Sequence, residues 1–174
     1  MTTVARFEKV SFDQFVKDWF NVCNSYMTEQ ELREIYDNIQ LPARSTAGSA
    51  GYDFRTPVPI TLAKNTWTTI PTGIRCKIEN GWFLDLTPRS GHGFKYGIKL
   101  ANTRGIIDSD YYDADNEGHI MIKLVNESVI SPGGFSVPAG TAIAQGIFTV
   151  FGLAENDNVT EKRTGGFGST DEKK

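Results

Sequence analysis

The segment Trp67–Leu86, with the sequence WTTIPTGIRCKIENGWFLDL, decides the fold of this chain. Turn residues divide it into three short runs that are rich in β-branched and aromatic side chains: Trp67–Ile70, Gly73–Ile78 and Trp82–Leu86. Runs of this length between turns are typical of β-strands. Further along the chain come three more: Ile120–Val125, Phe135–Val137 and Thr141–Val150. The chain from Ser49 onward is therefore predicted to be all-β, as a sandwich or jelly roll.

The N-terminal part follows a different pattern. Ala5–Val10 is predicted to be a first strand, and Ser11 with Gln14 forms an S-x-x-Q capping box, which favours the start of a helix. Apolar side chains then recur at helical spacing: Phe12, Phe15, Val16, Trp19, Phe20 and Cys23. A second capping box, Thr28 with Glu31, begins another amphipathic segment. We expect a two-helix insertion at about 11–39 that packs on the β core.

Composition limits the classes of function. The chain has 174 residues with 17 Gly and 7 Pro, which suits one β-rich domain. Its formal charge of -3 gives no basic field for a long nucleic acid. Cys23 and Cys76 lack the spacing of a disulfide framework or a zinc site, which favours a reducing compartment. With no signal-peptide pattern and no apolar stretch of membrane-spanning length, we expect a soluble cytoplasmic protein without a membrane partner.

The run Gly105–Tyr111, GIIDSDY, ends an apolar strand in two carboxylates, a hydroxyl and an aromatic ring. Ile106 and Ile107 are predicted to be buried. Asp108, at the rim of an apolar wall, can act as a general base, and the ring of Tyr111 offers a flat face to a ligand. Taken alone, however, the run favours an ordinary Asp-Ser-Asp turn between strands.

Four other segments carry side chains suited to a nucleotide. Ser49–Phe54 places a carboxylate after a glycine that permits close approach of the backbone. Pro88–Gly91 combines a guanidinium, a hydroxyl and a glycine amide, which suit an anionic phosphate. Ala144–Phe148 has one amide side chain in an apolar strand, and Arg163–Thr170 has a cation, exposed amides, hydroxyls and a ring. Together these segments can enclose a nucleoside triphosphate.

With these five segments in this order, from Ser49 to Thr170, the chain resembles the trimeric dUTPase family, whose members hydrolyse dUTP to dUMP and pyrophosphate and so keep uracil out of DNA. The resemblance implies a jelly-roll-like β subunit and a homotrimer with three active sites, each shared between subunits. It also implies a β domain at 1–158 and a C-terminal arm at 159–174 that closes over the nucleotide.

The resemblance further implies roles for single residues. Asp108 would activate a water against the α-phosphorus, and Tyr111 would pack on the deoxyribose and leave no room for a 2′-hydroxyl. Asn102 and the hairpin around Gly105 and Ile107 would read the uracil edge and exclude the methyl group of thymine. The phosphate-binding positions match Arg89, Ser90, Gly91 and Gln145. The arm would supply Arg163, Phe167, Gly168, Ser169 and Thr170, with Phe167 stacked on uracil.

A metal follows from the charge of a triphosphate, which repels an anion-like water unless it is offset. Mg²⁺ is the expected ion. Because Mg²⁺ keeps several waters and binds the phosphates themselves, we expect Asp53 to contact the waters of the metal rather than the metal.

Two stretches depart from the family pattern. Several extra residues, Tyr112–Glu117, precede Gly118; we favour a solvated loop over an added Mg²⁺ contact or a gate. Arg163 lies one position closer to the following glycines than is usual, which leaves open whether Lys162 or Arg163 serves the outer phosphate.

Two other functions compete with this interpretation. One is an enzyme like dCTP deaminase, although that family uses a glutamate where Asp108 stands. The other is a nucleotide-binding regulatory trimer that signals to a partner protein through the helical insertion, which would need an unusually large exposed apolar patch. His92 and His119 are expected to be ordinary surface or packing residues.

Overall fold

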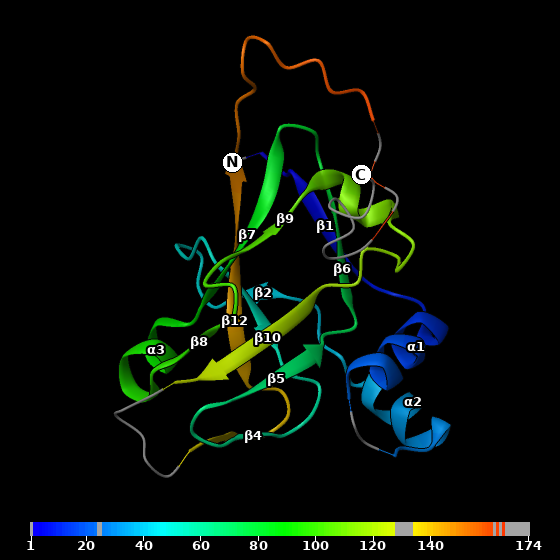
Figure 1. Ribbon diagram of the computed structural model, residues 1–174, viewed down its shortest axis with the longest axis vertical. Helices are drawn as coiled ribbons and strands as arrows, with labels where there is room; N and C mark the ends of the chain where they lie inside the picture. The colour runs from blue at the N-terminus through cyan, green and yellow to red at the C-terminus, as the bar shows by residue number, and fades with distance from the viewer. Residues whose placement is uncertain (1, 24–25, 128–133, 162, 164, 166–174) are drawn as a thin grey trace.

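Short antiparallel strands are the main regular structure in the computed structural model (Figure 1), which describes residues 2–23, 26–127, 134–161, 163 and 165. The strands are β1 (Ala5–Lys9), β2 (Ala43–Arg44), β3 (Tyr52–Arg55), β4 (Ile60–Leu62), β5 (Thr66–Pro71), β6 (Ile74–Ile78), β7 (Trp82–Pro88), β8 (Ile98–Leu100), β9 (Gly105–Ile107), β10 (Met121–Asn126), β11 (Phe135–Val137) and β12 (Ala142–Val150). The helices are α1 (Phe12–Val22), α2 (Glu29–Asp37), α3 (Ser90–Tyr96) and the short 3₁₀ helix η1 (Ser109–Asp113). The predicted jelly-roll-like β fold with a short helical insertion is confirmed.

The largest sheet has the strand order β2-β3-β12-β7-β9 and carries four of the predicted site residues, Asp53, Gly105, Ile107 and Gln145. A second sheet has the order β5-β10-β8, and two-stranded pairs join β1 to β6 and β4 to β11. Strand β7 lies between β12 and β9, so that Leu86 is opposite Gly146 on one side and Gly105 on the other. Strand β9 and strand β12, which includes Gln145, thus flank the same central strand.

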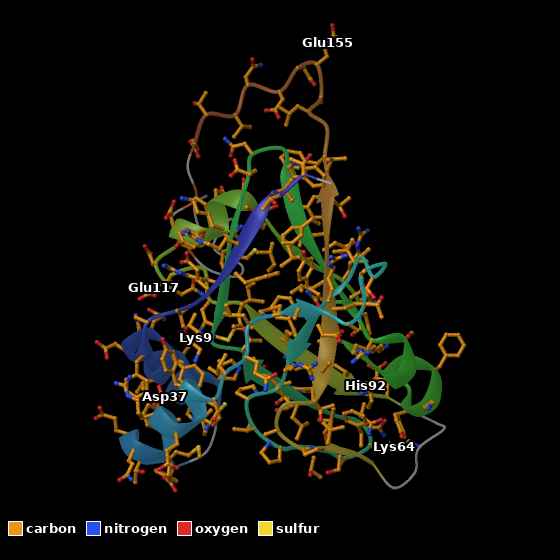
Figure 2. The ribbon with its side chains drawn as sticks, turned by 180° about the vertical axis from the view of Figure 1, so that it is seen from behind. Lys9, Asp37, Lys64, His92, Glu117 and Glu155 are labelled. Carbon is orange, nitrogen blue, oxygen red and sulfur yellow. The ribbon has the colours of Figure 1, made fainter. Side chains whose placement is uncertain are left out.

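Helices α1 and α2 pack on the β core with their apolar faces, as the helical spacing predicts. Phe15, Trp19 and Leu32 are buried in the same hydrophobic cluster as the strand residues. Lys9 on β1 fixes the end of α2, since its Nζ donates to the carbonyl oxygens of Tyr36 at 2.7 Å and Asp37 at 3.1 Å. Figures 1 and 2 place this pair of helices on one side of the molecule and α3 on the other. Among the described residues, no helix combines the length and the apolar character needed to cross a membrane.

Several local predictions were wrong. The segment from Ser90 to Tyr96 is helix α3, which was not predicted from the sequence. Ile106 was predicted to be buried but is 46% exposed, because neighbouring strand residues face opposite sides and Ile107 takes the inward position. Phe20, which the helical spacing placed on the apolar face of the first helix, is 55% exposed. Trp67 is 60% exposed in the single chain, with Lys123 Nζ 3.7 Å from the centre of its ring.

The start of α1 is capped by a residue far along the chain. Ser11 Oγ accepts from the Gln14 backbone N–H at 3.1 Å, as a capping box requires, but Gln14 does not return the bond. Glu117 takes the place of the Gln14 side chain in the capping box. Its carboxylate accepts from Ser11 N–H at 2.8 Å and from Ser11 Oγ at 2.6 Å. The solvated-loop interpretation of 112–117 therefore holds for the exposed Asp113 and Asp115 and is wrong for Glu117.

Replacing Glu117 with alanine should lower the free energy of unfolding by about 1 kcal/mol, because two orphan donors at the start of α1 lose their acceptor. Burial raises the pKa of the Glu117 carboxyl, but the hydrogen bonds from Ser11 outweigh it, and the pKa lies below its ordinary value of 4.5. A lowered pKa in the folded state contributes stability at neutral pH that is lost as the pH falls through that pKa. Urea titrations should therefore show the largest gap between the variant and the wild type at neutral pH and a shrinking gap below about pH 4.5. Asp115→Ala is the matched control in the same loop, and an equal loss in both variants would contradict the capping role.

Candidate active site

A pocket of about 440 Å³ lies against β8, β9 and the turn between them. The predicted hairpin around Gly105 and Ile107 is not a β-hairpin, because β8 pairs with β10 and β9 pairs with β7. Asn102, Gly105 and Ile107, which the sequence assigned to one binding surface, all line this pocket. A side chain at Gly105 would begin 3.2 Å from Leu86 Cβ and 3.7 Å from Asn102 Nδ2, so the glycine keeps the pocket open. The turn is anchored to β7 by Arg104, whose Nε and Nη2 donate to the two carboxylate oxygens of Asp85 at 2.7 and 2.6 Å.

The pocket also has lining residues that were not predicted from the sequence. They come from the end of α1, from the extra loop, and from the strands β5 and β10: Val22, Thr69, Asn116, Met121, Ile122 and Lys123. Val22 is the last residue of α1 and has no feature that signals a binding role. Asn116 lies in a loop that was predicted to be solvated, so its sequence context signals none either. Only the position of the extra loop directly after Tyr111 could have pointed to Asn116.

Asp108 follows the pocket strand β9 and stands at the start of η1, with its side chain 53% exposed. Arg163 Nη1 lies 3.2 Å from its Oδ2, and the Arg163 guanidinium lies 5.0 Å from the centre of the Tyr111 ring. The segment after β12 thus returns to the predicted catalytic residue, as Figure 1 shows. The other arm positions, Lys162, Phe167, Gly168, Ser169 and Thr170, lie outside the described residues.

Tyr111 is almost wholly buried, at 2% exposed. Its hydroxyl donates to the carbonyl oxygen of His119 at 2.8 Å and accepts from Asn116 Nδ2 at 2.8 Å. Burial raises the pKa of the phenol to about 12, so the ring stays neutral at physiological pH. The ring is therefore fixed by packing and by two hydrogen bonds. With the Arg163 guanidinium over it and no place in the lining of the pocket, it does not present the open flat face that the sequence predicted.

The predicted phosphate-binding residues form a second group around Asp53. Asp53 on β3 lies opposite Gln145 on β12, and its Oδ2 accepts from Ser45 Oγ at 2.9 Å and lies 3.5 Å from Arg89 Nη1. A side chain at Gly51 would begin 2.7 Å from Gln145 Oε1, which explains the glycine there. Ser90 and Gly91 begin α3 directly after Arg89. Motifs that are far apart in the sequence thus meet at one end of the large sheet.

These two groups do not meet within one chain. Ile107, which precedes Asp108, pairs with Leu84, whereas Arg89 lies five residues beyond Leu84 along β7. Five strand residues span about 16 Å. The carboxylate and the guanidinium of the same chain therefore lie too far apart to act on one phosphate.

A metal would find few protein ligands here. Within the described ranges, no group of three or more His, Cys, Asp or Glu side chains could hold an ion. The carboxylate of Asp53 is buried and already engaged by Ser45 and Arg89. Such a site suits an ion that is held mainly by the phosphates of a substrate, as Mg²⁺ often is.

Comparisons with known proteins identify the family. A family model described as dUTPase matches residues 37–171. Over 138 residues, 39% are identical to the deoxyuridine 5'-triphosphate nucleotidohydrolase of Lactococcus lactis subsp. lactis, which covers 76% of this chain and 88% of the relative. The crystal structure of dUTPase from Streptococcus mutans aligns with a TM-score of 0.60 and 32% identity over 77% of this chain and 96% of that one. A mutant dUTPase of phage phi11 of S. aureus, described as coordinating a structural Mg(II) ion, aligns with a TM-score of 0.59 at 19% identity over 91% of this chain and 98% of that one, which shows likeness of fold alone.

Proposed function

The chain belongs to the dUTPase family and is a dUTP diphosphatase, and from this premise we propose that Asp108 is the general base that directs water to the α-phosphorus of dUTP. The proposal is carried by one observation: Asp108 directly follows the strand whose Gly105 and Ile107 line the pocket. When the uracil base occupies the pocket, the sugar and phosphates of the nucleotide lie at the rim of the pocket, beside the half-exposed carboxylate of Asp108. As the water oxygen bonds to phosphorus, its proton passes to Asp108 and the bond to the pyrophosphate oxygen breaks.

The pocket selects uracil. The Asn102 side chain and the backbone at Gly105 and Ile107 pair with the polar edge of the base, which cytosine presents with the opposite pattern of donors and acceptors. The methyl of thymine is worth only about 1–3 kcal/mol by contact, so its exclusion depends on the close wall at Gly105 and Leu86. The Tyr111 ring packs on the deoxyribose and leaves no room for a 2′-hydroxyl.

Arg89, Ser90, Gly91 and Gln145 bind the phosphates. Asp53 supports this role, because its ion pair with Arg89 orients the guanidinium while 40% of the Arg89 side chain remains exposed for a ligand. Charge-assisted hydrogen bonds from arginine to phosphate are among the strongest in proteins. From the arm, Phe167 stacks on uracil, and Arg163 or Lys162, with Gly168, Ser169 and Thr170, holds the outer phosphates.

The complete site is shared between subunits of a homotrimer. The distance of about 16 Å along β7 between the Asp108 and Arg89 ends supports this, since one triphosphate cannot bridge the two groups of the same chain. In a cyclic assembly, Asp108 of one subunit meets Arg89 of another, and every site is equivalent. The Arg163 of the same chain, which lies on Asp108 here, belongs to the arm that closes over a nucleotide.

Mg²⁺ bound to the phosphates would offset their charge during attack by water. Asp53 would contact the waters of that ion, and its buried ion pair with Arg89 leaves it little room for direct coordination.

Pyrophosphate release with Mg²⁺ should be fast for dUTP and at least about 10²-fold slower in kcat/KM for dTTP, dCTP and UTP, because each differs by one group that the pocket excludes or mispairs. A coupled assay for pyrophosphate, run on all four nucleotides, measures this directly. Equal turnover of all four nucleotides would overturn the proposed roles of Asn102, Gly105, Ile107 and Tyr111. Ammonia release from dCTP would instead indicate the chemistry of the related deaminases.

A further inference from the structure

We propose that His119 and Asn116 are positioning residues for the rejection of ribose. Helix α1 holds His119, the loop 112–118 supplies Asn116, and together the two residues hold Tyr111 in place. The inference rests on the proposed contact between Tyr111 and the deoxyribose. It adds that two segments outside β9 and the turn before it support this contact: the helical insertion and the loop 112–118.

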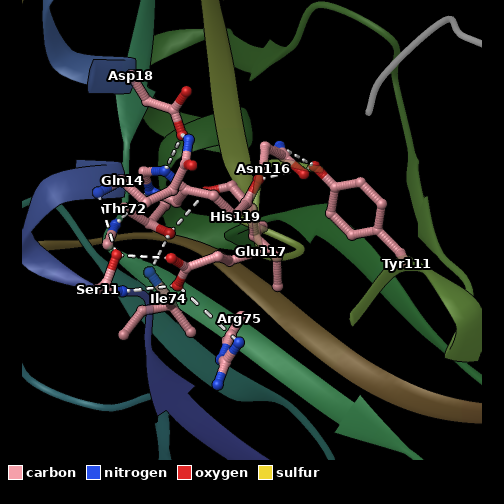
Figure 3. A network of polar contacts seen from close by, with 12 residues as sticks. Ser11, Gln14, Asp18, Thr72, Ile74, Arg75, Tyr111, Asn116, Glu117 and His119 are labelled. Atoms are coloured by element: carbon pink, nitrogen blue, oxygen red, sulfur yellow. Dashed lines mark hydrogen bonds and ion pairs between the residues drawn. The ribbon is translucent and has the colours of Figure 1, made fainter. Parts of the chain in front are cut away.

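His119 is the anchor of the network that Figure 3 draws, and its side chain is fully buried, at 0% exposed. Its Nε2 lies 2.7 Å from the backbone N–H of Gly73, so this nitrogen must accept and the proton is on Nδ1. Nδ1 then donates to Asp18 Oδ2 at 2.7 Å, and the same oxygen accepts from Gln14 Nε2 at 2.8 Å. The imidazole is thereby held between α1 and the turn before β6.

This grip fixes the backbone that Tyr111 contacts. The carbonyl oxygen of His119 accepts from the Tyr111 hydroxyl, and its N–H donates to the carbonyl of Asn116 at 3.1 Å. The loop closes tightly because Gly118 has φ +68°, and a side chain there would begin 2.6 Å from the carbonyl oxygen of Tyr111. A shift of α1 would thus be transmitted through Asp18 and His119 to the phenol.

Asn116 holds the hydroxyl from the other direction. Its Nδ2 donates to Tyr111 Oη, while its Oδ1 is buried and has no hydrogen-bond partner within the part of the chain that the structure describes. Asn116 also lines the nucleoside pocket. The amide therefore links the wall of the pocket to the angle of the ring.

A rigid ring matters for the choice of sugar. A single hydroxyl on a sugar is rejected by contact only if the wall cannot move away, since packed interiors relax by small shifts when a support is lost. A Tyr111 ring without its two hydrogen bonds keeps its shape and loses its fixed position. The kcat/KM for UTP should then rise by a larger factor than the kcat/KM for dUTP falls.

Asn116→Ala should lower the ratio of kcat/KM for dUTP to that for UTP by about fivefold, the weight of one lost hydrogen bond. We expect most of the change in the KM for UTP, because the ring that excludes the 2′-hydroxyl is no longer held in place. Asp115→Ala, which removes an exposed neighbour in the same loop, should keep the wild-type ratio.

A double-mutant cycle with Tyr111→Phe separates positioning from mere folding. If Asn116 acts through the Tyr111 hydroxyl, Asn116→Ala should change the ratio little in the Tyr111→Phe background. From the α1 side, Asp18→Ala should lower the ratio, and Asp18→Asn should restore it, because an amide oxygen can still accept from His119 and Gln14.

Additive effects of Asn116→Ala and Tyr111→Phe, or a ratio unchanged in every variant while the wild type prefers dUTP, would overturn the inference and leave the proposed function standing. If the wild type itself fails to prefer dUTP over UTP, the proposed function fails first. Thermal denaturation of each variant reports any loss of folding separately from the ratio.

Discussion

Replacing Asp108 with asparagine should lower kcat for dUTP by roughly 10²- to 10⁴-fold, the usual weight of a general base. Asparagine has the same shape and can still orient a water, but it cannot take the proton. Because the phosphates are held by other residues, the variant should still bind dUTP. Pyrophosphate release and a calorimetric titration with dUTP measure the two properties separately.

The matched control is Asp110→Asn, which removes the same charge two positions further on, from an exposed side chain on η1. It should turn over dUTP within a few fold of the wild type. Comparable losses in both variants would point to the overall charge of the loop rather than to Asp108. Undiminished turnover in Asp108→Asn would rule out Asp108 as the base.

Mixing two inactive variants, Asp108→Asn and Arg89→Ala, should restore part of the activity. Asp108→Asn and Arg89→Ala should each be nearly inactive, since one lacks the base and the other a phosphate ligand. If the two residues of a site come from different subunits, refolding an equal mixture should give about a quarter of intact sites by random assembly. Turnover of the mixture, compared with that of each variant refolded alone, measures the recovery.

The recovery depends on the distance between the two groups in one chain. A site built within one subunit would stay inactive in the mixture, because every chain lacks one of the two residues. As a control, the double variant mixed with wild type should show no recovery beyond the sites that wild-type pairs supply. A mixture that stays as slow as its components would refute shared sites.

The strands and the two helices near the N-terminus could be predicted because their signals are local. β11 has the predicted bounds, and most other predicted strands begin or end within two residues of the structure. Helix α3 was missed because Ser90–Tyr96 contains two glycines and has no amphipathic pattern. The short strands β2 and β8 depend on their partners in the sheets rather than on their own composition.

The pocket could be predicted in part. Asn102, Gly105 and Ile107 are near neighbours in the sequence, so motif spacing alone brings them together. Asn116 and Val22 reach the pocket only through tertiary packing of the extra loop and α1, which no local pattern encodes. His119 was expected to be a surface or packing residue; the structure confirms the packing but adds the contacts to Asp18 and Gly73, which lie far away in the sequence.

The bond between Ser11 and Glu117 joins positions that are 106 residues apart. The first turn of α1 therefore has its full set of hydrogen bonds only when the loop after η1 lies against it, which ties an element made early in synthesis to one made late. Contacts of such long sequence separation slow folding and make it more cooperative. Opening of the loop should expose the start of α1 to solvent at the same time, so that the two exchange their amide hydrogens as one unit.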